Sequence, residues 1–143
     1  MSAREKDLNP DVFIGLQLPL DKSSSGFFKQ TKTTLEQTKY NIINLLHTIK
    51  GERLGQPTFG SSIHYILFEP MTEDIEAKIE ESINESISEW LPYVTIKEIK
   101  FNYSHELDNQ ITVNVIFTLA FEPDKFGEVV VNFETFKDVI LGE

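Results

Sequence analysis

The sequence predicts an α+β fold, with helices packed on one face of a small antiparallel sheet, in a single domain of residues 12–143 that follows a flexible N-terminus of residues 1–11. Two segments, 33–50 and 72–91, carry apolar residues at spacings of three and four, the period of an amphipathic helix. From residue 94 onward apolar and polar residues alternate, which is typical of strands with one buried face. A chain of 143 residues with 40% hydrophobic content can bury one core. Helices followed by a run of strands favour this layered arrangement.

The composition narrows the class of function. The chain has no cysteine, which excludes disulfide bonds and thiolate metal sites. Its net charge of -10 argues against general binding of nucleic acid, because phosphate contacts need clustered Lys and Arg. No apolar run approaches the roughly 20 residues that cross a bilayer, and the start lacks the apolar stretch of a signal peptide. We therefore expect protein partners, no nucleic acid, no membrane, no cofactor, and a protein kept in a cytoplasm or carried in a particle assembled there.

The first element expected is a strand over Val12–Leu20, because apolar residues alternate with Gly15, Gln17 and Pro19. Pro19 cannot donate a hydrogen bond to a neighbouring strand, so this strand is expected at a sheet edge. The flexible connector that follows contains Phe27 and Phe28. These two side chains either cover the core or contact a partner.

The first long helix begins with a capping box. Thr33 and Glu36 are three residues apart, so each side chain can accept a hydrogen bond from the other residue's backbone N–H. Gly51 follows the last apolar position and predicts a left-handed residue at the helix end. The loop after it is rich in glycine and proline, with Phe59 as its apolar anchor, and Ser61 can cap a short helix. The apolar residues are Leu35, Ile42, Leu45, Leu46 and Ile49 in the long helix and Ile63, Ile66, Leu67 and Phe68 in the short one.

The second long helix is expected to begin at a Thr72 cap and to end before Pro92. One face is a ridge formed by Ile75, Ile79, Ile83 and Ile87, continued by Trp90 and Leu91. The opposite face concentrates negative charge against a single cation, Lys78. This acidic face is either simply solvated or a docking surface for a basic patch on a neighbouring protein. Its residues are Glu73, Asp74, Glu76, Glu80, Glu81, Glu85 and Glu89, of which Glu73, Glu76 and Glu80 are the named site candidates.

The remaining chain predicts three antiparallel strands. The apolar alternation changes phase between Ile96 and Ile99, which predicts a bulge or bend around Lys97 and Glu98. A hairpin loop over 104–110 leads into an unbroken alternating run over 111–121. Residues 122–127 contain Pro123 and Gly127 and predict the next turn. A third, shorter strand is expected to carry Val129, Val131 and Phe133.

Three short motifs identify a family. They are Gly51-Glu52-Arg53 at the helix end, Pro57-Thr58-Phe59-Gly60 in the loop, and Leu67-Phe68-Glu69-Pro70. In this order they resemble the baseplate wedge family of contractile phage tails, which includes the lysozyme-like wedge protein and relatives in type VI secretion baseplates. The specific part is 51–70, although the resemblance in layout spans 12–134. The resemblance implies the α+β fold and a structural, non-enzymatic role in a hetero-oligomeric virion tail baseplate assembled in the host cytoplasm.

The resemblance also implies two partners, the baseplate wedge core proteins and the tail sheath protein. Many family members read Glu-Pro-Arg at the wedge contact, where this chain has Met71, so the contact is either apolar or uses Arg53 instead. The implied wedge-docking residues are Glu52, Arg53, Phe59, Glu69 and Pro70. Glu69 could alternatively pair internally with Arg53. The sheath is expected to add a strand to an exposed sheet edge, either the final strand with Val129, Val131 and Phe133 or the strand that contains Pro19.

Two other functions remain open at this stage. A lysozyme-type hydrolase needs two carboxylates, one of them kept protonated by an apolar setting. Glu69 lies between the apolar residues Phe68 and Pro70, and no second acid is picked out at a telling spacing. An acidic adaptor could bind a basic partner through the helix over 72–91. Neither a metal site nor a nucleotide site is indicated, because His47, His64 and His105 lack ligand spacing and no phosphate-binding loop occurs. The sequence does not distinguish a phage tail from a secretion system or a free contractile particle.

Overall fold

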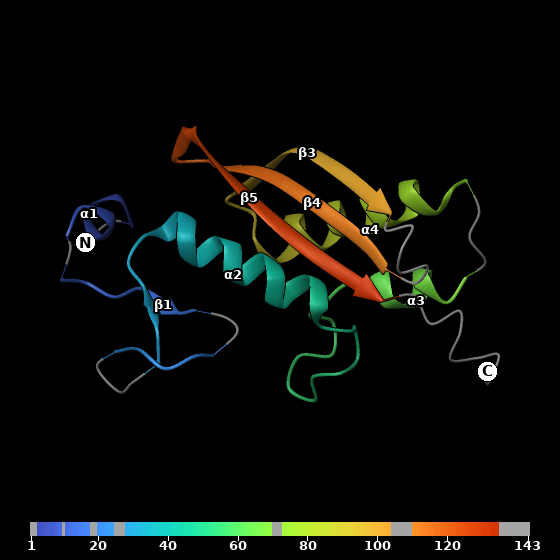
Figure 1. Ribbon diagram of the computed structural model, residues 1–143, viewed down its shortest axis with the longest axis horizontal. Helices are drawn as coiled ribbons and strands as arrows, with labels where there is room; N and C mark the ends of the chain where they lie inside the picture. Colours follow the sequence, from blue (N-terminus) through green and yellow to red (C-terminus); the bar gives the residue numbers. More distant parts are fainter. Residues whose placement is uncertain are drawn as a thin grey trace. The chain divides into compact units, whose positions relative to one another are not determined.

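A computed structural model describes residues 3–9, 11–17, 20–24, 28–69, 73–103 and 110–134 (Figure 1). Within these residues it contains four helices and five strands, which confirms the α+β class. The chain divides into two compact units, Met1–Asn44 and Leu45–Glu143. The boundary between the two units falls inside helix α2 (Thr34–His47).

The first unit contains a short helix and a short ribbon. Helix α1 (Ala3–Leu8) lies in the N-terminal stretch where no regular structure was expected. Strands β1 (Gly15–Leu16) and β2 (Gln30–Thr31) pair antiparallel over two residues each. The strand predicted over Val12–Leu20 is therefore wrong in length. Its partner strand cannot continue past Thr31, because the chain then enters the first turn of α2.

The ribbon also differs from the prediction in burial. Leu16, Leu20 and Phe28 are exposed, so the alternation does not mark a buried face and Phe28 does not cover a core. A ladder this short has too few neighbouring side chains to bury an apolar face. Pro19 and Phe27 lie outside the described residues.

The N-terminus of α2 is capped from two directions. Thr33 Oγ1 accepts the Glu36 N–H at 3.2 Å, as the capping box predicts. The Glu36 carboxylate accepts the N–H of Lys32 at 3.3 Å, one residue earlier than predicted. The Asp7 carboxylate accepts both the N–H and the hydroxyl of Thr34, at 2.8 and 2.9 Å. Side chains thus satisfy the backbone groups that a helix start leaves unpaired.

Helix α2 ends at His47, earlier than predicted, because the next residues pair with a distant segment. The Ser61 N–H donates to the Thr48 carbonyl at 2.9 Å, and the Lys50 N–H donates to the Ser61 carbonyl at 3.4 Å. The loop between them turns back at Gly51, which has the positive φ expected there, +93°. This pairing fixes both ends of the 51–60 loop.

Two buried serines of helix α4 (Ile75–Trp90) hold the segment that follows this loop. The Ser86 hydroxyl donates to the Gly60 carbonyl at 3.1 Å, and the Ser62 N–H donates to Ser82 Oγ at 3.1 Å. The Ser61 hydroxyl donates to the Leu46 carbonyl at 2.8 Å, so it satisfies the end of α2. Ser61 is therefore not the cap of helix α3 (Ile63–Leu67), whose N-cap residue is Ser62.

Helix α4 has the predicted apolar ridge and the predicted end. It finishes at Trp90, before Pro92, but it begins at Ile75 with Asp74 as its N-cap residue, so the start predicted at a Thr72 cap is wrong. All four ridge isoleucines are buried, namely Ile75, Ile79, Ile83 and Ile87.

The sheet of the second unit has the order β3 (Val94–Tyr103), β4 (Gln110–Leu119) and β5 (Glu122–Glu134), all antiparallel (Figure 1). The predicted bulge is confirmed, because the pairing register of β3 shifts between Ile96 and Glu98. This shift brings the apolar side chains before and after Lys97 onto the same face. Apolar residues of β4 are buried on that face.

Helices of the second unit lie against the buried face of the sheet. The ring of His64 in α3 meets Phe133 of β5 edge-on at 5.8 Å, and the Tyr103 hydroxyl of β3 donates to Glu76 of α4 at 2.6 Å. Helices on one face of the sheet were the predicted arrangement.

The turn predicted over residues 122–127 is wrong. The chain reverses at Ala120 and Phe121, and Leu119 already pairs with Glu122. Thr118 then pairs with Phe126, so the proline-containing stretch bulges out within β5 instead of reversing the chain. Gly127 serves packing, because an added Cβ there would overlap the ring of Phe117. Glycine is needed at this position because of a contact with a residue of another strand, which rules for local turns do not take into account.

Candidate functional site

Strand β5 forms one open edge of the three-stranded sheet. From Phe126 to Glu134 its pairing with β4 is continuous, and within the described part of the chain no strand lies on its other side. Val129, Val131 and Phe133 are buried, so these three side chains belong to the core. A partner at this edge would meet the backbone groups of those β5 residues whose N–H and C=O point away from β4, together with the outward side chains of the strand.

The opposite edge, β3, is a poorer surface for an added strand. The bulge at Lys97 interrupts its ladder, and Glu98 and Lys100 form an ion pair of 3.3 Å along it. Bulges and charged side chains are the devices by which natural sheets discourage pairing at an edge. Of the two edges of this sheet, β5 is therefore the better suited to pairing. The other edge considered from the sequence was the strand with Pro19, a residue outside the described ones.

The C-terminal end of β5 is flanked by two histidines. His47 and His64 lie 5.5 and 5.8 Å from the ring of Phe133, measured between ring centroids. Partial loss of water around His47 lowers its pKa, and the neighbouring His64 lowers it further. His64 Nε2 is buried and accepts or donates no hydrogen bond within the described residues. The environment of the His47 ring therefore favours its neutral form.

We expect His47 to make the fold less stable in mild acid. The folded-state pKa of His47 lies below its unfolded value of 6.5, so the unfolded chain takes up the proton first as the pH falls. Above pH 6.5 His47 is neutral in both states and does not change the free energy of unfolding. Below pH 6.5 the free energy of unfolding falls as the pH drops. Urea midpoints measured at pH 7.5 and 5.5 test this, and His47→Gln should shrink the difference. An unchanged difference would contradict it.

The 51–60 loop carries three of the predicted docking residues. The guanidinium carbon of Arg53 lies 4.1 Å from the ring centroid of Phe59, and that ring meets Trp90 edge-on at 5.1 Å. The Glu52 carboxylate accepts the N–H of Ile49 at 3.1 Å. Arg53 and Phe59 are thus brought together, whereas Glu52 serves the loop's own backbone.

Glu69 interacts with a residue outside the group formed by Arg53, Phe59 and Trp90. Its carboxylate forms an ion pair with Lys78 of α4, and not with Arg53, the internal partner considered as an alternative. Pro70 and Met71 lie outside the described residues.

Two aromatic residues, one in α3 and one directly after it, form an exposed patch that the sequence reasoning missed. Tyr65 is 57% exposed and Phe68, just after the helix, is 54% exposed. They are three residues apart and so are neighbours on one side of the helix. Phe68 was expected on the apolar side together with Ile63 and Leu67, which alone are buried in α3. The Tyr65 hydroxyl donates to the Lys50 carbonyl at 3.2 Å, which joins this patch to the base of the 51–60 loop.

The acidic face of α4 is exposed along its length, including Glu73, Glu76 and Glu80. Several of its charges already have partners. Glu76 accepts the Tyr103 hydroxyl, and burial together with this contact raises the pKa of Tyr103 to about 12. Glu85 lies 3.8 Å from Lys50. Because Glu76 and Glu85 already interact with residues of the same fold, part of this face contributes to the packing of the protein itself.

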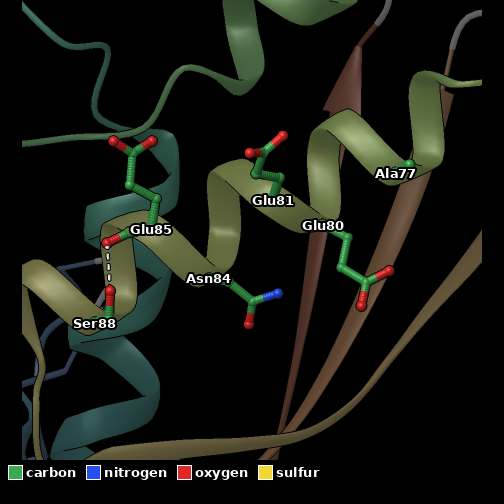
Figure 2. Close-up of a pocket in the computed structure, with 6 residues that line it drawn as sticks. All are labelled: Ala77, Glu80, Glu81, Asn84, Glu85 and Ser88. Atoms are coloured by element: carbon green, nitrogen blue, oxygen red, sulfur yellow. Dashed lines mark hydrogen bonds between the residues drawn. The ribbon is translucent and has the colours of Figure 1, made fainter.

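Figure 2 shows a shallow hollow along this face. Glu81 and Glu85 point to one side of α4, whereas Glu80 and Asn84 point to the other (Figure 2). The Ser88 hydroxyl donates to the Glu85 carbonyl at 3.0 Å. Side chains that line the hollow are Ala77, Glu80, Glu81, Asn84, Glu85 and Ser88.

The described residues do not assemble the features of a hydrolase. A general acid needs an apolar setting that keeps it protonated, whereas the Glu69 side chain is 51% exposed and paired with a lysine. No group of three or more His, Asp or Glu side chains in the described residues could hold a metal ion. Among the described helices, none is both long enough and apolar enough to cross a membrane.

Comparisons with known proteins agree with the resemblance. Residues 33–124 match the baseplate wedge protein gp25 family. The fold is similar to a crystal structure from Geobacter sulfurreducens provisionally named a tail lysozyme, with a TM-score of 0.65, 19% identity, and coverage of 73% of this chain and 93% of that chain. It is similar also to a chain of the anti-feeding prophage baseplate, with a TM-score of 0.63, 23% identity, and coverage of 73% and 83%. No curated protein matches the sequence. Because the family match covers well over half of the chain, the protein belongs to the baseplate wedge protein gp25 family and has a structural role in a baseplate.

Proposed function

We propose that this protein joins the wedge core of a contractile-tail baseplate and offers the free edge of β5 to an extended segment of the first sheath subunits. The observation that carries the proposal is the unbroken strand from Phe126 to Glu134, open on one side within the described residues. A strand that adds there gains backbone hydrogen bonds in a fixed register, and alternate side chains select the partner. The ion-paired and bulged edge of β3 offers no such continuous run.

The docking surface toward the wedge core is proposed to combine the α3 patch with the 51–60 loop. Tyr65 and Phe68 supply exposed aromatic area, the residue class that dominates binding energy at interfaces. Arg53 is held over Phe59, so little side-chain freedom would be lost when its guanidinium meets a carboxylate or carbonyl. Glu69 and Pro70 remain proposed members at the border of this surface.

In this role the protein makes and breaks no bond in a substrate. The name of tail lysozyme belongs to one similar structure, and at 19% identity that likeness concerns the fold alone. The acidic face of α4 is proposed as a secondary contact within the same assembly, because its charge would orient a basic neighbour more than hold it. A free-standing adaptor would instead bind one basic partner with strong dependence on salt.

Tyr65→Ser combined with Phe68→Ser is expected to weaken wedge-core docking about tenfold or more. Both side chains are more than half exposed, so the melting temperature should change little. The tagged chain would be co-expressed with the products of the reading frames that flank its gene, and co-purification of each product would be measured. Phe13→Ser, which removes an exposed aromatic side chain from the first unit, is the matched control. Full retention of wedge proteins by the double variant would place docking elsewhere.

A further inference from the structure

The two faces of β5 differ sharply along its open edge. Gly127, Val129, Val131 and Phe133 are buried, whereas Glu128, Val130 and Asn132 are exposed. A strand added to a sheet continues the pleat, so its side chains alternate between the same two layers. Those next to the buried valines would therefore be apolar, and those next to the exposed residues would be polar.

Glu128 stands on this open edge without a cation. Within the described parts of the chain no Lys or Arg lies within ion-pairing distance of it, and its partner is the Asn114 amide, whose Nδ2 donates to Oε1 at 3.4 Å. Glu98 occupies the same row at the opposite edge, since both pair with Ile116. The Glu98 carboxylate, in contrast, forms an ion pair with the Lys100 ammonium group, with an N–O distance of 3.3 Å. Glu98 and Glu128 therefore occupy equivalent positions of one row, but within the described residues only Glu98 has a cation of the same chain as its partner.

The residue beside Glu128 on the outer layer also favours a long side chain. Val130 is 52% exposed and follows Glu128 on the same face of β5. Lys and Arg can lay their aliphatic stems over apolar surface while their charged ends reach a carboxylate. A short polar side chain would leave Val130 uncovered and Glu128 without a cation.

We infer that the segment received at the β5 edge is an alternating strand, with apolar side chains toward the core and a Lys or Arg opposite Glu128. This inference rests on the proposed strand addition and specifies the chemistry of the partner. It holds for a parallel or an antiparallel partner, because both keep the alternation.

Three capped heptapeptides would test it on the full chain. All have valine at the odd positions, and the even positions are lysine in the first, glutamate in the second and threonine in the third. Dissociation constants would be measured by titration calorimetry, and hydrogen exchange would show which strand gains protection. We expect the lysine peptide to bind most tightly and to protect β5. Glu128→Gln should weaken it about two- to fivefold, the usual size of one cross-strand charge pair. Glu128→Lys should reverse the preference toward the glutamate peptide.

Glu98→Lys is the matched control, because it changes the net charge equally on the same row at the other edge. It should leave the preference for lysine nearly intact. If Glu98→Lys acts as strongly as Glu128→Lys, the effect is one of net charge and the inference fails. If all three peptides protect β5 equally, strand addition stands but the charge selection is overturned. If none protects β5, the proposed function itself fails at this edge.

Discussion

One of two proline substitutions, Val130→Pro or Val131→Pro, is expected to abolish growth of the sheath on the baseplate while the fold persists. Adjacent residues of an antiparallel strand direct their N–H groups to opposite sides, so one of these two groups points to β4 and the other to the free edge. Proline removes the N–H at its position. The variant that loses the edge-facing donor keeps the β4 ladder but can no longer pair fully with an incoming strand.

Alanine at each position separates backbone effects from packing effects. Val131 is buried and Val130 is exposed, so Val131→Ala alone should cost some stability and Val130→Ala little. The edge-facing proline should destabilise the fold not much more than alanine does at the same position. The other proline breaks a hydrogen bond of the β4–β5 ladder and should destabilise the fold clearly more than alanine does at the same position.

Urea denaturation identifies which proline faces the edge, and electron microscopy of assembled tails measures sheath growth on each variant. We expect sheath-free baseplates from the variant that retains its stability. Sheath of normal length on that variant would show that β5 is not the receiving edge. Loss of the baseplate itself would instead point to a role of β5 in docking to the wedge.

The outcome matters because the side chains named at this edge from the sequence turned out to be core residues. Alternation correctly indicated a strand at Val129, Val131 and Phe133, but alternation marks which side chains are buried, not which backbone groups are free. Edge position depends on strand order, which is a tertiary property. The phase change between Ile96 and Ile99, in contrast, predicted the bulge in β3, because a buried face leaves little freedom of register.

Other failures have the same origin in contacts between distant residues. Serine is a polar residue by composition, yet Ser82 and Ser86 are buried because they bond to the backbone around Gly60. Pro123 and Gly127 have the composition of a turn, yet the chain reverses before them. The exposed side chain of Tyr65, which belongs to the proposed docking surface, was not found from the sequence, because the motif that indicated the family drew attention to Glu69.

Gly60→Ala is expected to be the most destabilising single-methyl change in the 51–60 loop. Gly60 has a φ of +127°, which L residues rarely adopt, and an added Cβ would overlap the Thr48 carbonyl oxygen. The obstacle is backbone, and the Ser61 N–H bonds to that same carbonyl at 2.9 Å, so relief requires breaking the pairing that closes the loop. Unfavourable φ costs about 1–3 kcal/mol and overpacking a further 1–3 kcal/mol.

The other two glycines of the loop separate these costs. Gly51 has a φ of +93° but nothing within 4 Å of an added Cβ, so Gly51→Ala should show the cost of backbone strain alone. Gly55 has open space around it and no positive φ, so Gly55→Ala should change the free energy of unfolding by no more than about 0.5 kcal/mol. Urea denaturation of the three variants should therefore rank Gly60 above Gly51 and Gly51 above Gly55. Equal losses at Gly60 and Gly51 would mean that the Thr48 contact yields without cost, and the loop would then be too pliant to hold Arg53 and Phe59 as a preformed docking surface.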